Sequence, residues 1–248
     1  MREYITKNKI KSFFVIIFWI LIWQIMSMIF KEEILFVSPF KVFKVLAMDL
    51  TERTFYINVL STIIKIISGF ITGFISGILM AVIAYKNRIF KSFIDLPMLF
   101  IKSVPVVSFI IILLLVFKSE NLPVIISFIM VVPIIYLNVY EGLNNVDKNY
   151  LKMALIYRVS LKNKIKYIYL SSLKPFLYSS ISLSCGLAFK SGLAAEVIAL
   201  PKYGIGTMLY NSKIYLDAAN LFSYTIVAVI LSYIFEKLIL CICRRILK

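Results

Sequence analysis

Long apolar stretches alternate with shorter polar segments along almost the whole chain. A bilayer core of about 30 Å is crossed by roughly 20 helical residues, and six stretches reach or approach that length. They lie at residues 13–30, 57–84, 97–117, 123–140, 175–198 and 221–243. The pattern predicts an all-α, polytopic membrane protein with six transmembrane helices in a single domain that spans residues 1–248.

The first apolar stretch follows a basic run, so a cleaved signal peptide is the competing interpretation. The stretch is longer than a signal sequence requires and no small-residue cleavage site follows it, which favours a retained anchor. Pro105 and Pro133 interrupt the third and fourth stretches. Proline frees carbonyl groups that neighbouring helices or water must satisfy, so we expect both helices to lie inside a bundle.

Small residues recur at helical spacing in the second stretch. Gly69, Gly73 and Gly77 form a doubled G-x-x-x-G pattern. In lipid, such a face lets another helix approach closely, whereas a lipid-facing glycine run would weaken the helix without any gain. We therefore expect these three glycines to pack against a neighbouring helix.

Basic residues predict the orientation. Most of them fall at the N-terminus, in a predicted short loop at 85–96, in the segment 141–174 and at the C-terminus. Because basic residues concentrate in cytoplasmic loops, both termini are expected in the cytoplasm. The segment 31–56, with mixed charges, is expected at the outer surface, and residues 199–220 are expected to form an outer loop.

Composition narrows the function classes. The 248 residues are 61% hydrophobic with a mean hydropathy of +0.94, and the net charge is +16. The positive charge lies in loops between apolar stretches, which argues against a nucleic-acid partner. The chain has no histidine, three cysteines and only 12 acidic residues. No phosphate loop, metal cluster or nucleophile–base pair is visible, so we expect neither an enzyme nor a bound metal or cofactor.

The segment 141–174 is polar and basic, yet its pattern is helical. Leu151, Ala154 and Leu155 fall on one helical face among several lysines. A connection of this length inside a membrane protein is either disordered or functional. The pattern favours a short helix at the membrane surface that faces a partner.

This segment resembles the coupling loop of ABC importer permeases, in particular the nitrate/sulfonate/taurine type. The residues that carry the resemblance are Gly142, Leu143, Val146, Asp147, Ala154, Ser160, Leu170 and Pro175. The likeness extends from about residue 36 to residue 238. In that family the loop forms a helix that docks into a groove on a cytoplasmic ATPase. The docking residues implied by the resemblance are Gly142, Val146, Asp147, Leu151, Lys152, Met153, Ala154, Arg158 and Ser160.

The sequence departs from the family at three points of this segment. The family's Glu-Ala-Ala triplet is Lys152-Met153-Ala154, its following glycine is Arg158, and an expected proline is Ser171. These departures put the manner of ATPase docking in question. They also keep open a rival hypothesis, a permease-derived membrane scaffold or regulatory protein that is no longer coupled to an ATPase.

The fifth apolar stretch is the most polar, and Gly186 to Glu196 resembles the family's G-x-A-W and A-A-E pattern. Ser184, Ala188, Gly192 and Glu196 are spaced four apart, and together with Lys190 they are candidates for a translocation pathway. A charge within a span is a functional-site hypothesis. Glu196 is equally compatible with a boundary position, solvated or capping structure.

Three lysines lie within the apolar stretches. Lys190 is expected to face a pathway and favour an anion, whereas Lys65 and Lys102 are expected to be structural. The resemblance implies a type I ABC importer permease, N-in and C-in, in a bacterial inner membrane. It also implies a second copy of the chain, a cytoplasmic ATPase dimer that binds ATP, and an extracytoplasmic substrate-binding protein. The solute would be a small anion, a sulfonate or a vitamin precursor.

Overall fold

The computed structural model describes residues 2–30 and 37–246, and every regular element within these ranges is helical. In chain order the elements are α1 (Arg2–Phe30), α2 (Pro39–Asp49), α3 (Arg53–Lys86), α4 (Arg88–Ser103), α5 (Val106–Leu114), α6 (Leu122–Asn144), α7 (Lys148–Ile156), α8 (Leu161–Lys164), the π-helical turn η1 (Ile165–Tyr169), α9 (Leu170–Ala199), α10 (Ile205–Ile214) and α11 (Ala218–Ile246).

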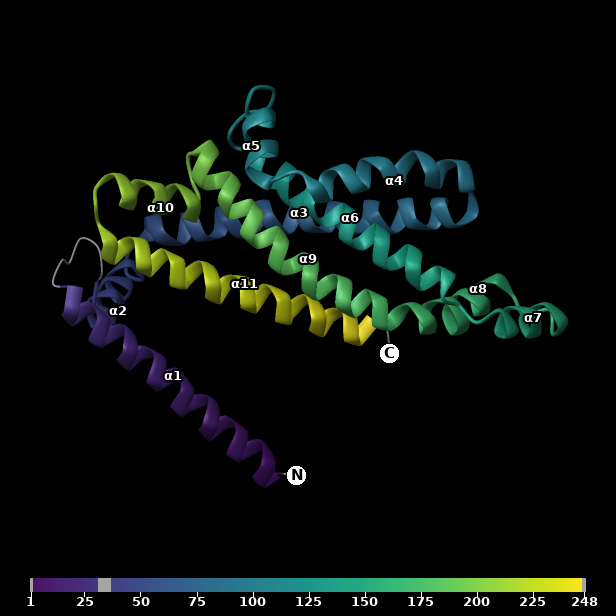
Figure 1. The fold of residues 1–248 in the computed structure, drawn as a ribbon, viewed down its shortest axis with the longest axis horizontal. Coiled ribbons are helices and arrows are strands. Elements are labelled where there is room, and N and C mark those ends of the chain that lie inside the picture. The colour runs from purple at the N-terminus through teal and green to yellow at the C-terminus, as the bar shows by residue number, and fades with distance from the viewer. Residues whose placement is uncertain (1, 31–36, 247–248) are drawn as a thin grey trace.

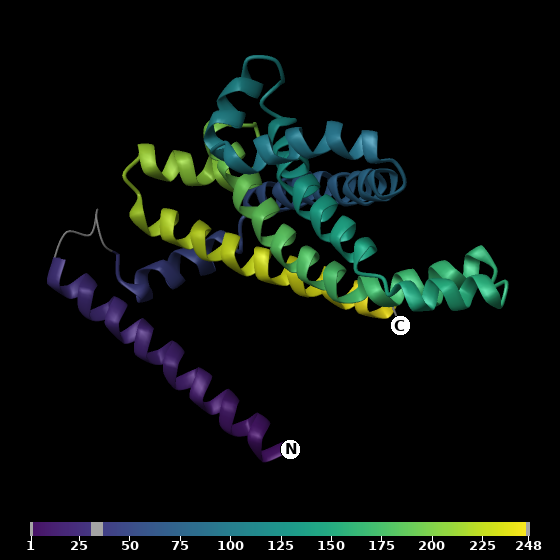
Figure 2. The same ribbon diagram turned by 45° about the vertical axis from the view of Figure 1, so that its right-hand side comes forward.

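Helix α6 is the centre of the bundle. Its most extensive contacts are with α3 and α9, and α4, α5 and α11 pack around these three helices. The short helix α10 lies at one end of the bundle, and α7 and α8 project beyond the other end (Figures 1 and 2). Helix α1 leaves the bundle in both views. The main core forms where aromatic and aliphatic side chains of α3, α6, α9 and α11 meet, around Tyr136 and Phe189.

The α3–α6 contact explains the glycine repeat. Gly69, Gly73 and Gly77 are buried against α6, where their missing side chains leave room for the neighbouring helix. A Cβ at Gly69 would lie 2.4 Å from the carbonyl oxygen of Val124. Close backbone approach of this kind joins helices where apolar attraction alone does not.

The six predicted spans are not all recovered among the described residues. Within the described residues, four helices are long and apolar enough to cross a membrane, and a fifth span is possible if α4 and α5 count as one. The described apolar part of α1 is the shorter piece Ile17–Ile29. The prediction of one continuous span at 97–117 is wrong, because α4 and α5 meet at an angle of 102°. Pro105 lies at that break, where its ring cannot continue the helix.

Two predicted loops are largely helical. The expected loop at 85–96 is reduced to Asn87, whose side chain accepts hydrogen bonds from the backbone N–H groups of Ile89 and Phe90 and so begins α4. The segment 141–174 is also shorter than predicted, since α6 continues to Asn144 and one long helix already runs from Leu161 to Ala199. That helix replaces the fifth span predicted at 175–198.

The remaining boundaries move less. The second span begins at Arg53 rather than at residue 57, and the outer loop predicted at 199–220 contains α10. In the segment 31–56, residues 31–36 lie outside the described ranges, and α2 follows. Ser38 caps α2 by accepting a hydrogen bond from Lys41 N, and Phe40 and Phe43 are exposed on it.

Candidate functional site

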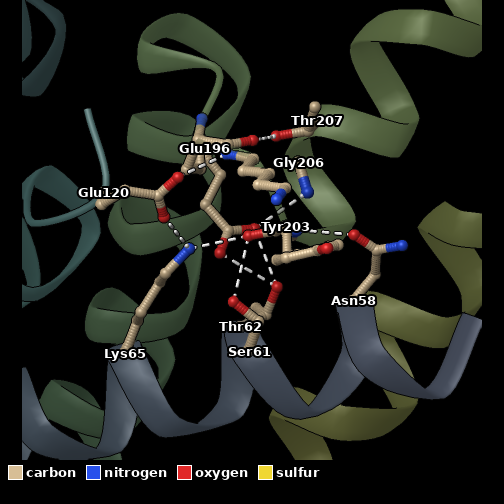
Figure 3. Close-up of polar contacts among 12 residues, drawn as sticks. Asn58, Ser61, Thr62, Lys65, Glu120, Glu196, Tyr203, Gly206 and Thr207 are labelled. Carbon is tan, nitrogen blue, oxygen red and sulfur yellow. Dashed lines mark hydrogen bonds and ion pairs between the residues drawn. The ribbon is translucent and has the colours of Figure 1, made fainter. Parts of the chain in front are cut away.

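The α10 end of the bundle holds a buried polar cluster centred on Glu196, which Figure 3 shows. The carboxyl group of Glu196 accepts hydrogen bonds from the Thr62 hydroxyl, at 2.8 Å, and from the backbone N–H of Gly206, at 2.9 Å. The Thr62 oxygen in turn accepts one from the N–H of Ile205. Glu196 is fully buried. These contacts join α3, α9 and the start of α10, and Glu196 is buried among them rather than solvated.

A second layer of contacts fixes the segment between α9 and α10 on α3. The Lys65 ammonium group donates a hydrogen bond to the carbonyl of Tyr203 and forms an ion pair of 3.3 Å with Glu120 (Figure 3). Asn58 accepts a hydrogen bond from the N–H of Gly204. The structural role predicted for Lys65 is therefore confirmed.

Two glycines make this cluster possible. A Cβ at Gly204 would lie 2.6 Å from the Glu196 carboxyl carbon, and a Cβ at Gly206 would lie 2.3 Å from the Glu196 Cβ. Both values are far below an ordinary contact, so any side chain at either position would displace Glu196 or the chain around it. The carboxyl group and the two glycines form one packing unit.

The predicted pathway residues are divided between two environments. Ser184, Ala188, Gly192 and Glu196 are buried inside the subunit, where Ser127 of α6 donates a hydrogen bond to the carbonyl of Ala188. Lys190 lies on a different side of α9 and is exposed. The structure therefore separates Lys190 from the four residues that the sequence grouped with it.

Lys190 lines a groove of about 1170 Å³ between α4, α6 and α9. Polar and charged residues of all three helices contribute to its walls. They are Lys91, Asp95, Lys102, Asn138, Glu141, Ser182 and Lys190. The sequence interpretation did not group these side chains into one site, since only the fold shows which helices line the groove.

One side of the groove carries a paired charge. Asp95 contacts the Lys91 ammonium group one turn earlier on α4, and its other oxygen accepts a hydrogen bond of 2.7 Å from the Tyr136 hydroxyl. Lys91 also lies over the ring of Tyr140, 5.2 Å from its centroid. The charges of Lys91 and Asp95 therefore balance each other and connect α4 to α6.

Beyond the other end of the bundle, α7 and the start of α8 form a helical hairpin that we call the coupling hairpin (residues 145–164) (Figures 1 and 2). Asp147 caps α7 by accepting a hydrogen bond from Asn149 N, and Ser160 caps α8. Val146 and Ala154 are buried. Lys152 and Met153 are exposed on α7, whereas Gly142, on α6, is packed against Leu173 and Phe176 of α9.

The turn of the coupling hairpin explains the position of Arg158. This residue has a φ of +47°, in the left-handed region that glycine adopts without steric cost. The Val159 N–H bonds to the carbonyl of Ala154, and the Arg158 N–H bonds to that of Leu155. This is the Schellman arrangement that ends many helices. Arg158 thus keeps the backbone shape expected where the family has glycine.

The tip of the coupling hairpin exposes large apolar side chains. Leu155 is 77% exposed and Leu161 is 78% exposed, and Ile156 and Tyr157 between them are similarly exposed. Basic side chains, including Lys152, interrupt this apolar surface. Exposed apolar surface within a polar surround is typical of a protein interaction site.

A metal site has no basis in the described ranges 2–30 and 37–246. No three or more cysteine and acidic side chains come together there in a way that could hold an ion. The site residues that the structure does bring together are those of the Glu196 cluster, the groove and the coupling hairpin.

Comparison with known proteins gives a family match over residues 73–247, more than two thirds of the chain. The family is described as "Binding-protein-dependent transport system inner membrane component". The bicarbonate transport system permease protein CmpB of Synechococcus elongatus is 22% identical over 65% of this chain and 58% of its own length. The nitrate import permease protein NrtB of the same organism is 27% identical over 45% of this chain and 40% of its own length. The chain thus aligns with less than two thirds of these relatives.

Proposed function

We propose that this chain forms the solute pathway of an ATP-driven importer for a small anion. The chain belongs to the binding-protein-dependent transport system inner membrane component family. As a family member it is an ABC transporter permease of the inner membrane, and its long apolar helices agree with that location. The relatives CmpB and NrtB are named as bicarbonate and nitrate permeases, which supports an anion as the solute.

The observation that carries the proposal is the coupling hairpin. It projects beyond the bundle and exposes four apolar side chains near its tip, those of Leu155, Ile156, Tyr157 and Leu161, among basic residues. Because the hairpin projects beyond the end of the bundle, its exposed apolar tip is available to a groove on a soluble protein. The partner would be a cytoplasmic ATPase dimer, which would supply ATP hydrolysis to a pair of these permease chains. An extracytoplasmic binding protein would deliver the solute.

The experiment that tests the proposal is reconstitution. The permease, its ATPase and its binding protein are placed in lipid vesicles, and uptake of nitrate, bicarbonate and methanesulfonate is measured with and without ATP. ATP-dependent uptake of at least one anion is expected. A permease that binds no ATPase would favour the scaffold hypothesis instead. An assembled complex that hydrolyses ATP without moving any of the three would contradict a small anion of this kind as the solute.

Orientation gives an independent prediction. With six spans and both termini inside, a reporter fused after Lys248 or inserted near Asp147 should report the cytoplasm, and one near Lys202 should report the outside. The cytoplasmic location near Asp147 follows from the proposed role of the coupling hairpin, which must reach a cytoplasmic ATPase. A reporter near Asp147 that is accessible only from outside would contradict both the orientation and the coupling role.

Charge on the coupling hairpin gives a second prediction. Lys152 is exposed on α7 where the family has glutamate. We expect its own ATPase to present a complementary acidic groove, because charge complementarity decides between partners. Lys152→Glu should lower permease-stimulated ATP hydrolysis about tenfold, consistent with about 1.4 kcal/mol of lost complementarity.

The matched control for this change is Lys86→Glu, which reverses an exposed charge at the end of α3 outside the coupling hairpin. It should leave ATP hydrolysis within about twofold of the wild type, because an isolated exposed charge contributes little. Stronger hydrolysis with Lys152→Glu would mean that the hairpin prefers the family's ordinary partner and that no acidic groove compensates for Lys152.

A further inference from the structure

Two lysines in the groove between α4, α6 and α9 stand out by their lack of partners. Lys102, from α4, and Lys190, from α9, both line the groove and are both exposed. Among the described residues, neither makes a hydrogen bond or an ion pair, whereas Lys91 is paired with Asp95. An ammonium group within a membrane-spanning bundle is costly unless water, a carboxylate or an anion solvates it.

The acidic groups of the groove lie away from these two lysines. Asp95 is seven residues before Lys102 on α4, which corresponds to about 10 Å along the helix. Glu141 is near the end of α6 that leads to the coupling hairpin, whereas α4 and α9 both run from that end towards α10 (Figure 1). Among the described residues, Asp95 is thus paired with Lys91, and no acidic group of the groove forms an ion pair with Lys102 or Lys190.

The remaining acid near Lys190 is Glu236 of α11. It lies on a separate cleft of about 500 Å³ that Lys190 also lines. Its carboxyl group accepts a hydrogen bond from the Ser182 hydroxyl and makes no ion pair with Lys190. Because Glu236 and Lys190 line the same cleft, a test of Lys190 has to include Glu236.

We propose that Lys102 and Lys190 form a binding site for a small oxyanion in this groove. This inference rests on the proposed function, and these two lysines would select the charge of the solute. Two ammonium groups from different helices suit an anion with several oxygen atoms, because each can donate to a different oxygen. An anion held between α4 and α9 would also connect two helices that the groove separates. This role for Lys102 replaces the structural one expected from the sequence.

The test uses the reconstituted importer in vesicles of phosphatidylcholine and phosphatidylethanolamine, with nitrate, bicarbonate and methanesulfonate as probes. Lys190→Met and Lys102→Met should each lower ATP-dependent uptake at least about tenfold, the usual loss for one charge-assisted hydrogen bond. Lys190→Arg should keep most of the uptake because it keeps the charge. Lys118→Met, which removes an exposed charge outside the groove, should change uptake less than about twofold.

A second readout separates the site from the transport function. In purified permease without the ATPase, the same anion should raise the unfolding temperature of the wild type and of Lys118→Met, and should not do so for Lys190→Met. Uptake by the wild type together with equal uptake by the methionine variants, at equal amounts of folded protein, overturns the anion site and leaves the importer intact. Absence of uptake in the wild type, with the anion-dependent shift retained, overturns the transport function and supports the site.

Two further arms exclude other occupants. If the methionine variants only change how much anionic phosphatidylglycerol the folded protein needs, the lysines hold a lipid phosphate group and the proposal fails. If Glu236→Gln lowers uptake as much as Lys190→Met while Lys102→Met has no effect, Lys190 acts through Glu236 and the proposal likewise fails. Under the proposal, Glu236→Gln keeps the anion-dependent shift.

Discussion

Alanine at Gly69 is expected to remove most of the folded protein. The added Cβ would lie 2.4 Å from the carbonyl oxygen of Val124 and 2.8 Å from the Cβ of Ser127, so α3 and α6 would have to separate. Inserting a group into a well-packed contact typically costs about 1–3 kcal/mol, and rigid backbone on both sides places this site at the upper end. Folded yield after solubilisation and the unfolding temperature measure the effect.

The other glycines give a graded series for the same experiment. A Cβ would lie 2.8 Å from its nearest neighbour at Gly77 and 3.0 Å at Gly73, so alanine should be less harmful at Gly77 than at Gly69 and least harmful at Gly73. Leucine at Gly73 should nevertheless be severe. The controls are Gly186→Ala, which meets nothing within 4 Å, and Ile71→Leu on the exposed face of α3. Equal yields for Gly69→Ala and Gly186→Ala would show that α3 and α6 do not need this close contact.

Glu196→Ala is expected to lower the unfolding free energy by about 2–4 kcal/mol, because it leaves the Gly206 N–H and the Thr62 hydroxyl buried without their acceptor. The segment 200–206 should then become sensitive to proteolysis before the rest of the bundle opens. Calorimetry or thermal unfolding in detergent, with proteolysis followed by mass spectrometry, measures both effects.

The control for this cluster is Glu120→Gln. The Glu120 side chain is half exposed, so its ion pair with Lys65 should contribute less than about 1 kcal/mol. Glu196→Gln should fall between the two, since the amide oxygen can still accept one of the hydrogen bonds. If Glu196→Ala were no more harmful than Glu120→Gln, the buried contacts of Glu196 would not be what holds the segment 200–206.

The sequence was sufficient to predict an all-helical membrane protein and its family, because long apolar runs and a few motif positions carry that information. Helix boundaries were harder. Residues 85–96 contain charged side chains and look like a loop by hydropathy, but Asn87 starts a helix through hydrogen bonds that hydropathy does not represent. The 102° angle between α4 and α5 was not predicted either, although Pro105 marked its position.

For the site, side-chain type was predictable and side-chain neighbours were not. Lys190 was identified as an unusual charge in an apolar helix, and the structure places it on a groove. The sequence predicts a structural role for Lys102, because only the fold shows that α4 and α9 line the same groove. Glu196 and Thr62 are 134 residues apart, so no local pattern could predict their hydrogen bond. Arg158 was noted in the sequence only as a departure from the family's glycine, and its positive φ shows that the backbone nevertheless adopts the left-handed conformation that glycine adopts without steric cost.

The glycine contact between α3 and α6 also has a mechanical consequence. The backbones are in direct contact, with no flexible side chains between them, so the two helices cannot slide or tilt independently without breaking that contact. We therefore expect α3 and α6 to move as one rigid unit. Any change of shape must then be absorbed at joints where helical hydrogen bonding is interrupted. The break at 104–105 and the turn at 157–160 are two such joints, and one of them lies in the coupling hairpin. Force applied to the hairpin would bend it at its tip, and any displacement passed on through α6 would move α3 and α6 together.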